Sequence, residues 1–133
     1  MNKILTSDKI YIAQSQIPNA GRGVFAKKHI KKDEIIETCP VIPLSPKETA
    51  DITDGALITY LYYFGEEKER SLVVLGFGAI YNHTAEPNAV YKEHETEQLM
   101  EFIALEDIKK DEEITVNYNQ HTPYDKTPLW FVE

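Results

Sequence analysis

Cysteine is almost absent from this chain of 133 residues. Cys39 is the single cysteine, so the chain can form no internal disulfide and no zinc site built from several thiolates. A lone cysteine beside Pro40 in a hydrophobic stretch is more often a small core residue than a nucleophile. The four histidines show neither a close pair on a helix nor a ligand cluster, so we predict no metal site.

Long hydrophobic runs are also missing. No apolar segment approaches the roughly twenty residues that span a bilayer, and the first residues lack the long apolar region of a signal peptide. We therefore expect a cytoplasmic protein with no membrane segment. Walker-type loops, Gly-x-Ser-x-Gly elbows and complete dinucleotide-binding loops are absent too, which argues against the common nucleotide-binding and hydrolase sites.

Positive charge is in deficit, because 22 acidic residues face 14 basic ones and the net charge is −8. Binding to a nucleic-acid backbone needs a positive surface, so we expect no direct nucleic-acid partner. A negative field attracts a basic ligand, such as a protein tail rich in lysine and arginine. It also simply keeps a protein soluble, and charge alone favours that simpler explanation.

The remaining composition is that of one globular domain. The chain is 42% hydrophobic and 27% charged, and its length is common for a single domain, so we expect residues 1–133 to form one. Short apolar or β-branched runs separated by turns predict a mainly β fold. The expected strands cover residues 10–12, 24–26, 71–75, 99–105 and 113–116, with an edge or irregular strand at 41–42 between two prolines.

Helix signals are few. Ser45-Pro46-Lys47-Glu48 combines a serine cap, a proline at the first helical position and a glutamate at the third, which predicts a short helix that ends before Gly55. The aromatic-rich segment 57–64 fits a hairpin strand and a helical stripe about equally well.

Polar residues stand among apolar ones in the segment 76–91. Asn82 and His83 offer an amide and an imidazole side by side, which suits a polar ligand held by directed hydrogen bonds. The same two residue types also satisfy backbone groups in irregular loops. On these two residues alone, that structural explanation is the better one.

The chain contains, in this order, the segments AGRGVFA at 20–26, NHTAEPN at 82–88, FIALEDI at 102–108 and EEITVNY at 112–118. Together these four segments resemble the SET-domain family of protein lysine methyltransferases. Residues 82–88 (NHTAEPN) are similar to the family's Asn-His-Ser-x-x-Pro-Asn motif, and residues 112–118 (EEITVNY) to its Glu-Glu-Leu-Thr-x-x-Tyr motif. Residues 20–26 (AGRGVFA) resemble its opening glycine turn, and residues 102–108 (FIALEDI) its Phe-x-Ala-x-Arg-Asp-Ile segment. Any one similarity would be weak, but four in the family's order argue against coincidence.

The resemblance implies a SET-domain β-clip fold, mainly β with few short helices. Its final segment is threaded, as a pseudoknot, through the loop of Asn82-His83, which brings the two main motifs together. It also implies S-adenosylmethionine as the cofactor, held by the turn Ala20-Gly21-Arg22 and by Asn82 and His83. Trp130 would cover the adenine in place of a zinc-bearing tail, although an aromatic residue near a chain end is equally explained by core packing.

The resemblance also implies an enzyme that acts on a lysine of a basic protein or peptide, such as a histone. Tyr118 would be its catalytic tyrosine, orienting the amine and stabilising the transferred methyl group. Tyr91 would hydrogen-bond the amine and limit the number of methyl groups added, although packing of a strand-face tyrosine on the core explains it equally well. A homodimer that completes the substrate groove is also compatible with so small a domain.

Two departures from the family pattern leave alternatives open. Cys39 falls where many relatives have a tyrosine that lines the lysine channel, and Val116 falls at a position that controls the degree of methylation. The degree of methylation therefore stays open. A catalytically inactive SET-like module that binds peptides is the alternative to an enzyme.

Overall fold

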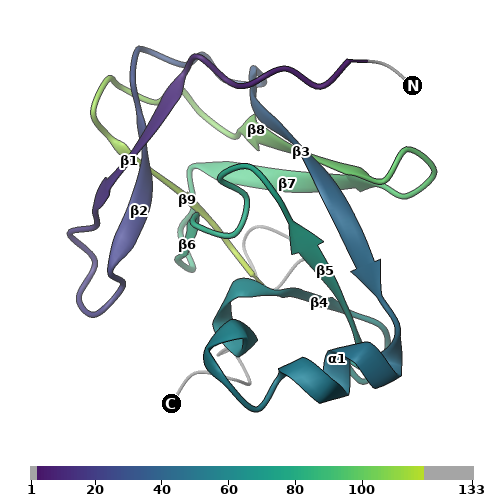
Figure 1. Cartoon of the computed structure of the whole chain (residues 1–133). Helices are drawn as coiled ribbons and strands as arrows, with labels where there is room; N and C mark the ends of the chain where they lie inside the picture. The colour runs from purple at the N-terminus through teal and green to yellow at the C-terminus, as the bar shows by residue number, and fades with distance from the viewer. Residues whose placement is uncertain (1–2, 119–133) are drawn as a thin grey trace.

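The computed structural model describes residues 3–118, which form two β-sheets and two short helices (Figure 1). Trp130 and the threading of the final segment lie outside the described residues and stay predictions. The elements, in chain order, are β1 Ile10–Gln14, β2 Arg22–Ala26, β3 Ile35–Leu44, α1 Pro46–Ile52, the 3-10 helix η1 Ala56–Tyr60, β4 Tyr62–Phe64, β5 Arg70–Val74, β6 Asn82–His83, β7 Ala89–His94, β8 Leu99–Ala104 and β9 Glu113–Val116.

The smaller sheet has the strand order β1-β2-β9-β6, and the larger has β4-β5-β3-β8-β7. In the smaller sheet, β9 pairs antiparallel with β2 and parallel with β6. Three segments that are far apart in the sequence therefore lie side by side. The mainly β fold with few short helices is confirmed, and the expected strands are present.

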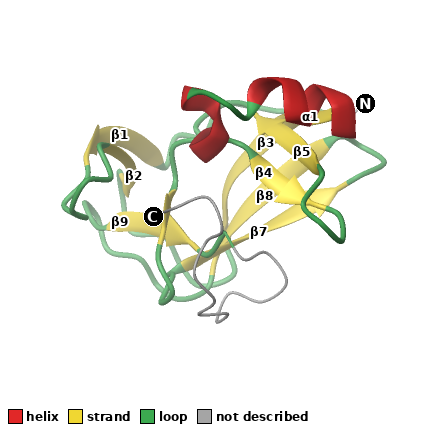
Figure 2. Ribbon diagram, turned by 90° about the horizontal axis from the view of Figure 1, so that it is seen from below, coloured by secondary structure: helices red, strands yellow, loops and turns green. Residues whose placement is uncertain are grey.

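The expected helix is confirmed with its capping box. The Ser45 hydroxyl accepts a hydrogen bond from the Glu48 amide at 3.1 Å, and the Glu48 carboxylate accepts one from the Ser45 amide at 2.9 Å. Helix α1 packs against β3 and β5, beside η1 at the same side of the molecule (Figure 2). Within residues 3–118, no helix is long and apolar enough to cross a membrane.

The ambiguous segment 57–64 contains both of the predicted structures in succession. Its first part belongs to η1, and its last three residues form β4, which pairs antiparallel with β5. The polar segment 65–69 connects the two strands, as expected. The hairpin is therefore shorter than predicted, and its first strand begins only at Tyr62.

The expectation of an edge or irregular strand at residues 41–42 is confirmed locally, because these residues pair with β5 on one side only, while the pairing of β3 with β8 ends at Pro40. As a whole, β3 is nevertheless a central strand between β5 and β8, with a register shift between Ile35 and Glu37. The prolines are tolerated because β3 changes partner: its pairing with β8 ends at Pro40, and the Val41 amide donates to the Gln98 carbonyl at 3.0 Å. Successive residues of a strand point their backbone nitrogens to opposite sides, so the nitrogen of Pro43 points to the same side as the Val41 amide, where β8 has already ended.

The core lies between the two sheets. Tyr81 and Phe102 are fully buried, and their rings stack with centroids 4.1 Å apart. Cys39 is also fully buried, and burial raises the pKa of its thiol well above the usual range. The thiol therefore stays protonated at neutral pH, in agreement with its interpretation as a core residue.

Candidate active site

The two main motifs meet at the pairing of β6 with β9. Asn82 lies opposite Thr115 and His83 opposite Val116 in a parallel register, and the Thr84 amide donates to the Val116 carbonyl at 3.0 Å. The predicted meeting of the Asn82-His83 loop with the segment before Tyr118 is thus present.

Asn88 fastens the two motifs to each other. This side chain is 7% exposed. Its Oδ1 accepts a hydrogen bond from the Thr115 amide at 2.9 Å, and its Nδ2 donates to the Glu113 carbonyl at 2.9 Å. A single buried amide therefore satisfies two backbone groups of β9, which fixes the position of β9 beside the loop that follows β6.

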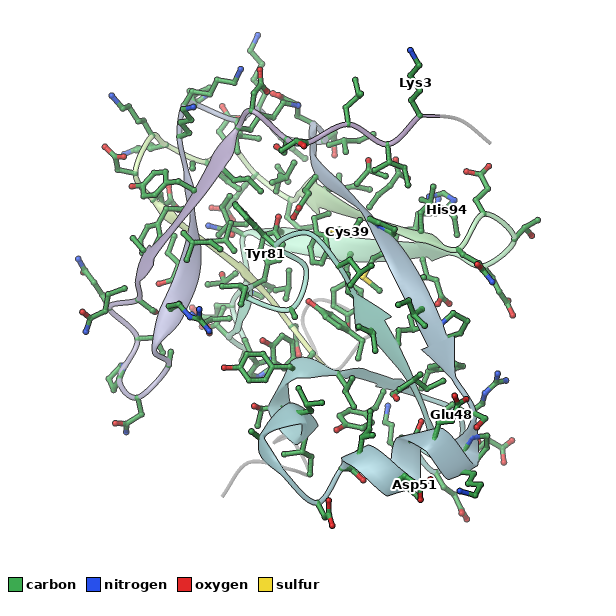
Figure 3. The ribbon with its side chains drawn as sticks, viewed as in Figure 1. Lys3, Cys39, Glu48, Asp51, Tyr81 and His94 are labelled. Carbon is green, nitrogen blue, oxygen red and sulfur yellow. The ribbon has the colours of Figure 1, made fainter. Side chains whose placement is uncertain are left out.

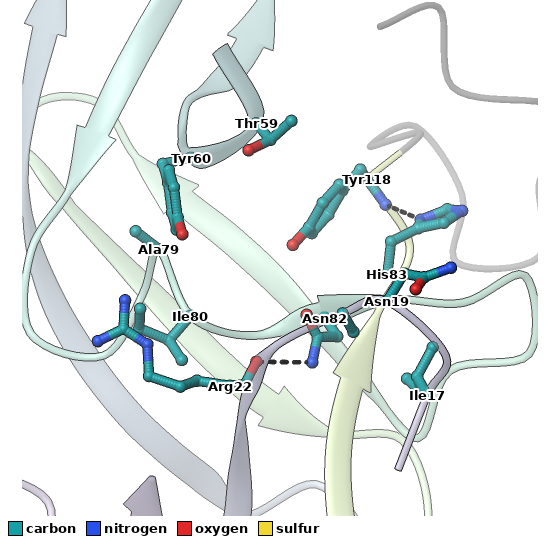
Figure 4. Close-up of a pocket in the computed structure, with 11 residues that line it drawn as sticks. Ile17, Asn19, Arg22, Thr59, Tyr60, Ala79, Ile80, Asn82, His83 and Tyr118 are labelled. Carbon is teal, nitrogen blue, oxygen red and sulfur yellow. Dashed lines mark hydrogen bonds between the residues drawn. The ribbon is translucent and has the colours of Figure 1, made fainter. Parts of the chain in front are cut away.

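A cavity of about 370 Å³ opens where β2, β6 and the end of β9 come together (Figure 4). Five of the predicted site residues line it: Ala20, Arg22, Asn82, His83 and Tyr118. Gly21 lies in the same turn with a φ of 73°, in the left-handed region where glycine is favoured. The sequence analysis missed six further lining residues: Ile17, Asn19, Thr59, Tyr60, Ala79 and Ile80.

The amide of Asn82 is oriented by its neighbours. Its Nδ2 donates to the Arg22 carbonyl at 2.9 Å and to Glu113 Oε2 at 2.8 Å. Both N–H groups are used by the protein, so Oδ1 remains to accept a hydrogen bond from a molecule in the cavity. A Cβ added at Gly23 would stand 2.4 Å from Glu113 Oε2, which explains why a glycine occupies this position.

Glu113 also holds the loop on the opposite side of the cavity. Its Oε1 accepts a hydrogen bond from the Ser15 hydroxyl at 2.7 Å. The Ser15 amide in turn donates to the Gly21 carbonyl at 2.8 Å, which closes the turn that carries Ala20 and Arg22. One carboxylate thus connects β9 with the β1–β2 turn and with Asn82.

His83 is held in one tautomer by the backbone. Its Nδ1 accepts a hydrogen bond from the Tyr118 amide at 2.9 Å (Figure 4). Burial lowers the pKa of this imidazole, so the ring is neutral at neutral pH and carries its proton on Nε2. His83 therefore offers a donor at Nε2 while it fixes the start of Tyr118.

The lowered pKa of His83 predicts a loss of stability in mild acid. Below the usual histidine pKa of about 6.5, residue 83 binds a proton more readily in the unfolded chain than in the folded chain. The contribution of neutral His83 to the free energy of unfolding is therefore complete above about pH 6.5. It decreases as the pH falls from there to the lower pKa of the folded state. Urea unfolding at pH 7.5 and 5.5 measures how much the free energy of unfolding decreases in acid. This decrease should be smaller for His83→Gln than for the wild type, because the glutamine does not titrate and its amide oxygen still accepts from the Tyr118 amide. Equal decreases in the two proteins would contradict this account.

Tyr118 separates the cavity from a cluster of aromatic side chains. Its hydroxyl donates to the Tyr81 carbonyl, and burial raises the pKa of this hydroxyl, so it remains a donor at neutral pH. Its ring lies 5.2 Å from the His83 ring on the cavity side and 5.8 Å from the Tyr62 ring.

Tyr62 and Tyr91 form the aromatic cluster with Tyr118. The Tyr62 and Tyr91 rings meet edge to face with centroids 4.8 Å apart. The Tyr91 hydroxyl donates to the Tyr118 carbonyl at 3.3 Å, and the Tyr62 hydroxyl donates to the Gly78 carbonyl at 2.7 Å. Tyr91 therefore fits both of its interpretations. It is 8% exposed, as a tyrosine packed on the core would be, and it contacts Tyr118, as a tyrosine of the lysine site would.

Tyr62 is a functional candidate that the sequence analysis missed. Its signal was the aromatic-rich segment 57–64, but that segment fits two periodicities, and only the fold shows which face of β4 points inward. Tyr62 and Cys39 both belong to the buried core. Among the described residues, no three His, Cys, Asp or Glu side chains gather as they would around a metal ion.

Comparison with known proteins identifies the family. A family model described as "SET domain" matches residues 21–119. A protein of Schizosaccharomyces pombe named "Histone-lysine N-methyltransferase, H3 lysine-37 specific" is 31% identical over 112 residues, which cover 84% of this chain and 70% of that protein.

Solved structures agree with this match. The crystal structure of a Plasmodium falciparum protein, described as a candidate histone methyltransferase, is 36% identical, with a TM-score of 0.68 over 92% of this chain and 100% of that chain. A chain of Chaetomium thermophilum Polycomb Repressive Complex 2, in an autoinhibited conformation bound to S-adenosylmethionine, is 26% identical, with a TM-score of 0.67 over 90% of this chain and 16% of that chain. The family expected from the four motifs is confirmed: the chain belongs to the SET-domain family of protein lysine methyltransferases.

Proposed function

We propose that this protein transfers a methyl group from S-adenosylmethionine to the side-chain amine of a lysine in a basic protein. The observation that carries the proposal is the position of Tyr118. It lines the cavity on one side and contacts the buried pair Tyr62 and Tyr91 on the other. A cofactor site in the cavity and a lysine site at the aromatic cluster would thus share Tyr118.

The cavity residues fit the cofactor. Its amino-acid end carries a carboxylate and an ammonium, which the Arg22 guanidinium and the free Oδ1 of Asn82 can bind. Ile17 and Ile80 give the cavity apolar walls for the rest of the molecule, and its volume lies in the range of about 300–1,000 Å³ usual for ligand sites. The bound cofactor would supply a methyl group activated by a positively charged sulfur.

The tyrosine cluster fits the requirements of the lysine amine. A lysine is protonated at neutral pH, with an ordinary pKa of about 10.4, and only the neutral amine can attack a methyl group. The buried aromatic walls of Tyr62 and Tyr91 disfavour the charged ammonium by desolvation. Tyr118 would then hold the amine in line with the methyl group, and such alignment supplies most of the rate in a reaction of this kind.

The substrate is proposed to be a lysine in a basic protein such as a histone. The net charge of −8 attracts a chain rich in lysine and arginine and repels a nucleic-acid backbone. The similarity to a relative named for a histone lysine supports the same substrate class. The alternative of an inactive peptide-binding module rested on the small side chain of Cys39, and the tyrosines Tyr62 and Tyr91 that contact Tyr118 weaken that alternative.

A transfer assay tests the proposed function. The protein is incubated with S-adenosylmethionine labelled in its methyl group and with mixed histones, an acidic protein or DNA as the acceptor. We expect label on the histones alone and its loss in Asn82→Ala, whereas Gln14→Ala, an exposed amide on β1, should behave as the wild type. Peptide binding without any transfer would instead identify the binding module.

Replacing Glu113 with glutamine should weaken cofactor binding about tenfold, a cost of about 1.4 kcal/mol. The new amide can donate as well as accept, so it no longer fixes the Asn82 amide with Oδ1 free. Calorimetric titration with S-adenosylmethionine measures the affinity. Glu106→Gln is the matched control, because this carboxylate is exposed and lies away from the cavity lining. Equal affinities of the two variants would contradict the role of Glu113.

A further inference from the structure

A buried carboxylate lies in the core next to the proposed active site. Glu37 is 8% exposed, although glutamates are rarely buried. The register shift between Ile35 and Glu37 turns two successive residues, Ile36 and Glu37, toward the core, and such bulges typically redirect a side chain. The bulge therefore places a charge in the interior, where the side chains of Cys39 and Tyr81 also lie (Figure 3).

Glu37 holds both ends of the loop that precedes β6. Its Oε2 accepts a hydrogen bond from the Phe77 amide at 2.9 Å, and its Oε1 accepts one from the Tyr81 hydroxyl at 2.8 Å. A Cβ added at Gly76 would stand 2.6 Å from Oε2, and Gly76 has a φ of 66°. The chain thus wraps closely around the carboxylate, which is satisfied by neutral donors and has no ion pair with any of the described residues.

The same loop supplies the acceptors for two tyrosines of the site. The Gly78 carbonyl accepts the Tyr62 hydroxyl at 2.7 Å, and the Tyr81 carbonyl accepts the Tyr118 hydroxyl. Both acceptors lie in the segment that begins at Phe77 and ends at Tyr81, which are the two residues bonded to Glu37. The position of the carboxylate therefore determines where the two tyrosine hydroxyls are held.

We propose that Glu37 is a positioning residue for methyl transfer, acting through the 77–81 loop on the hydroxyls of Tyr62 and Tyr118. The proposal rests on the proposed function for its catalytic consequence. Glu37→Gln keeps the size of the side chain but offers only one acceptor oxygen to the Phe77 amide and the Tyr81 hydroxyl, so this hydroxyl must turn round to accept from the new amide or lose its partner. The loop, and with it the two hydroxyls, should then shift.

Kinetics give the first readout. We expect Glu37→Gln to lower kcat about ten- to a hundredfold, as small displacements of a reacting group do. The cofactor KM should change less than about threefold, because the 77–81 loop contributes only the apolar side chains of Ala79 and Ile80 to the cavity, whereas Arg22 and Asn82 lie on β2 and β6. Tyr81→Phe breaks the same contact from the other side and should reproduce the effect. It also keeps the proposal testable if Glu37→Gln does not fold.

A matched control separates positioning from plain loss of stability. Thr49→Val removes another buried hydrogen bond, 2.9 Å between the Thr49 and Ser71 hydroxyls beneath α1, and should lower the melting temperature without lowering kcat. If kcat of Glu37→Gln falls no further than that of Thr49→Val, or if kcat and the cofactor affinity fall together, the proposal is overturned.

The second readout does not depend on activity. The protein has eight tyrosines, so labelling their ζ carbons with ¹³C gives a spectrum in which Tyr62 and Tyr118 can be assigned by substitution with phenylalanine. Their signals should move in Glu37→Gln and stay in place in Thr49→Val. Unmoved signals overturn the proposal. Moved signals in a protein that transfers no methyl group support the positioning role while the proposed function itself fails.

Discussion

Replacing Tyr118 with phenylalanine should reduce the rate of methyl transfer about a hundred- to a thousandfold, the usual cost of removing one oriented hydrogen-bonding group from an active site. The hydroxyl is held by the Tyr81 carbonyl, and burial keeps it protonated. The ring remains in the variant, and so does the bond from the Tyr118 amide to His83. The affinity for S-adenosylmethionine should therefore stay within about threefold of the wild type.

Steady-state kinetics with a histone acceptor and calorimetry with the cofactor measure the two quantities separately. Tyr11→Phe is the matched control, because it removes a hydroxyl that donates to Asp111 Oδ1 at 2.9 Å on the surface, away from the site. It should retain the full rate. A Tyr118→Phe variant as fast as the Tyr11→Phe variant would mean that the hydroxyl has no part in the reaction.

Replacing Asn88 with alanine should lower the free energy of unfolding by about 3–5 kcal/mol. The change leaves the Thr115 amide and the Glu113 carbonyl without their partner in a buried place, and each unsatisfied buried group costs about 1–3 kcal/mol. Because these groups fix β9 beside the Asn82-His83 loop, cofactor binding should also weaken at temperatures where the variant is still folded.

Urea unfolding measures the loss, and calorimetry below the unfolding transition measures the binding. Asn88→Asp is an informative partner, since it keeps an acceptor for the Thr115 amide but turns a carboxylate oxygen toward the Glu113 carbonyl and the Glu112 carboxylate, which both accept from Asn88 Nδ2 in the wild type. This repulsion should make it no more stable than the alanine variant. Lys92→Ala, an exposed change on β7, the strand that follows Asn88, should have little effect. An alanine variant at residue 88 that unfolds at the same urea concentration as the wild type would contradict the account.

Local signals explain the parts of the fold that could be predicted. The capping box at Ser45 and Glu48 depends only on neighbouring residues, and the runs at 71–75 and 113–116 form strands wherever their partners lie. The motif order correctly predicted that Asn82 and Tyr118 lie close together, since both line one cavity. The central position of β3 could not be predicted, because proline disfavours central strands, and the change of partner that admits Pro43 is a long-range feature.

Two residues of the site that could not be predicted lie in the ambiguous segment 57–64. Tyr60 and Tyr62 stand two positions apart, yet one is in η1 at the cavity and the other in β4 in the aromatic cluster. The backbone changes from helical to extended between them, so their side chains point in different directions. The sequence of this segment fits the helical and the strand periodicity alike. Glu37 was missed because a charged residue in a strand is expected to face water, whereas a bulge turns it inward.

The central claim is that one site, formed by β2, β6 and the end of β9, carries a methyl group from S-adenosylmethionine to a lysine. The most direct test uses cofactor with a trideuterated methyl group, histone acceptors and tandem mass spectrometry of the products. The account predicts the deuterated methyl group on lysine side-chain nitrogens, with the wild-type protein but not with Asn82→Ala. Label on other atoms, or equal labelling by both proteins, would contradict it.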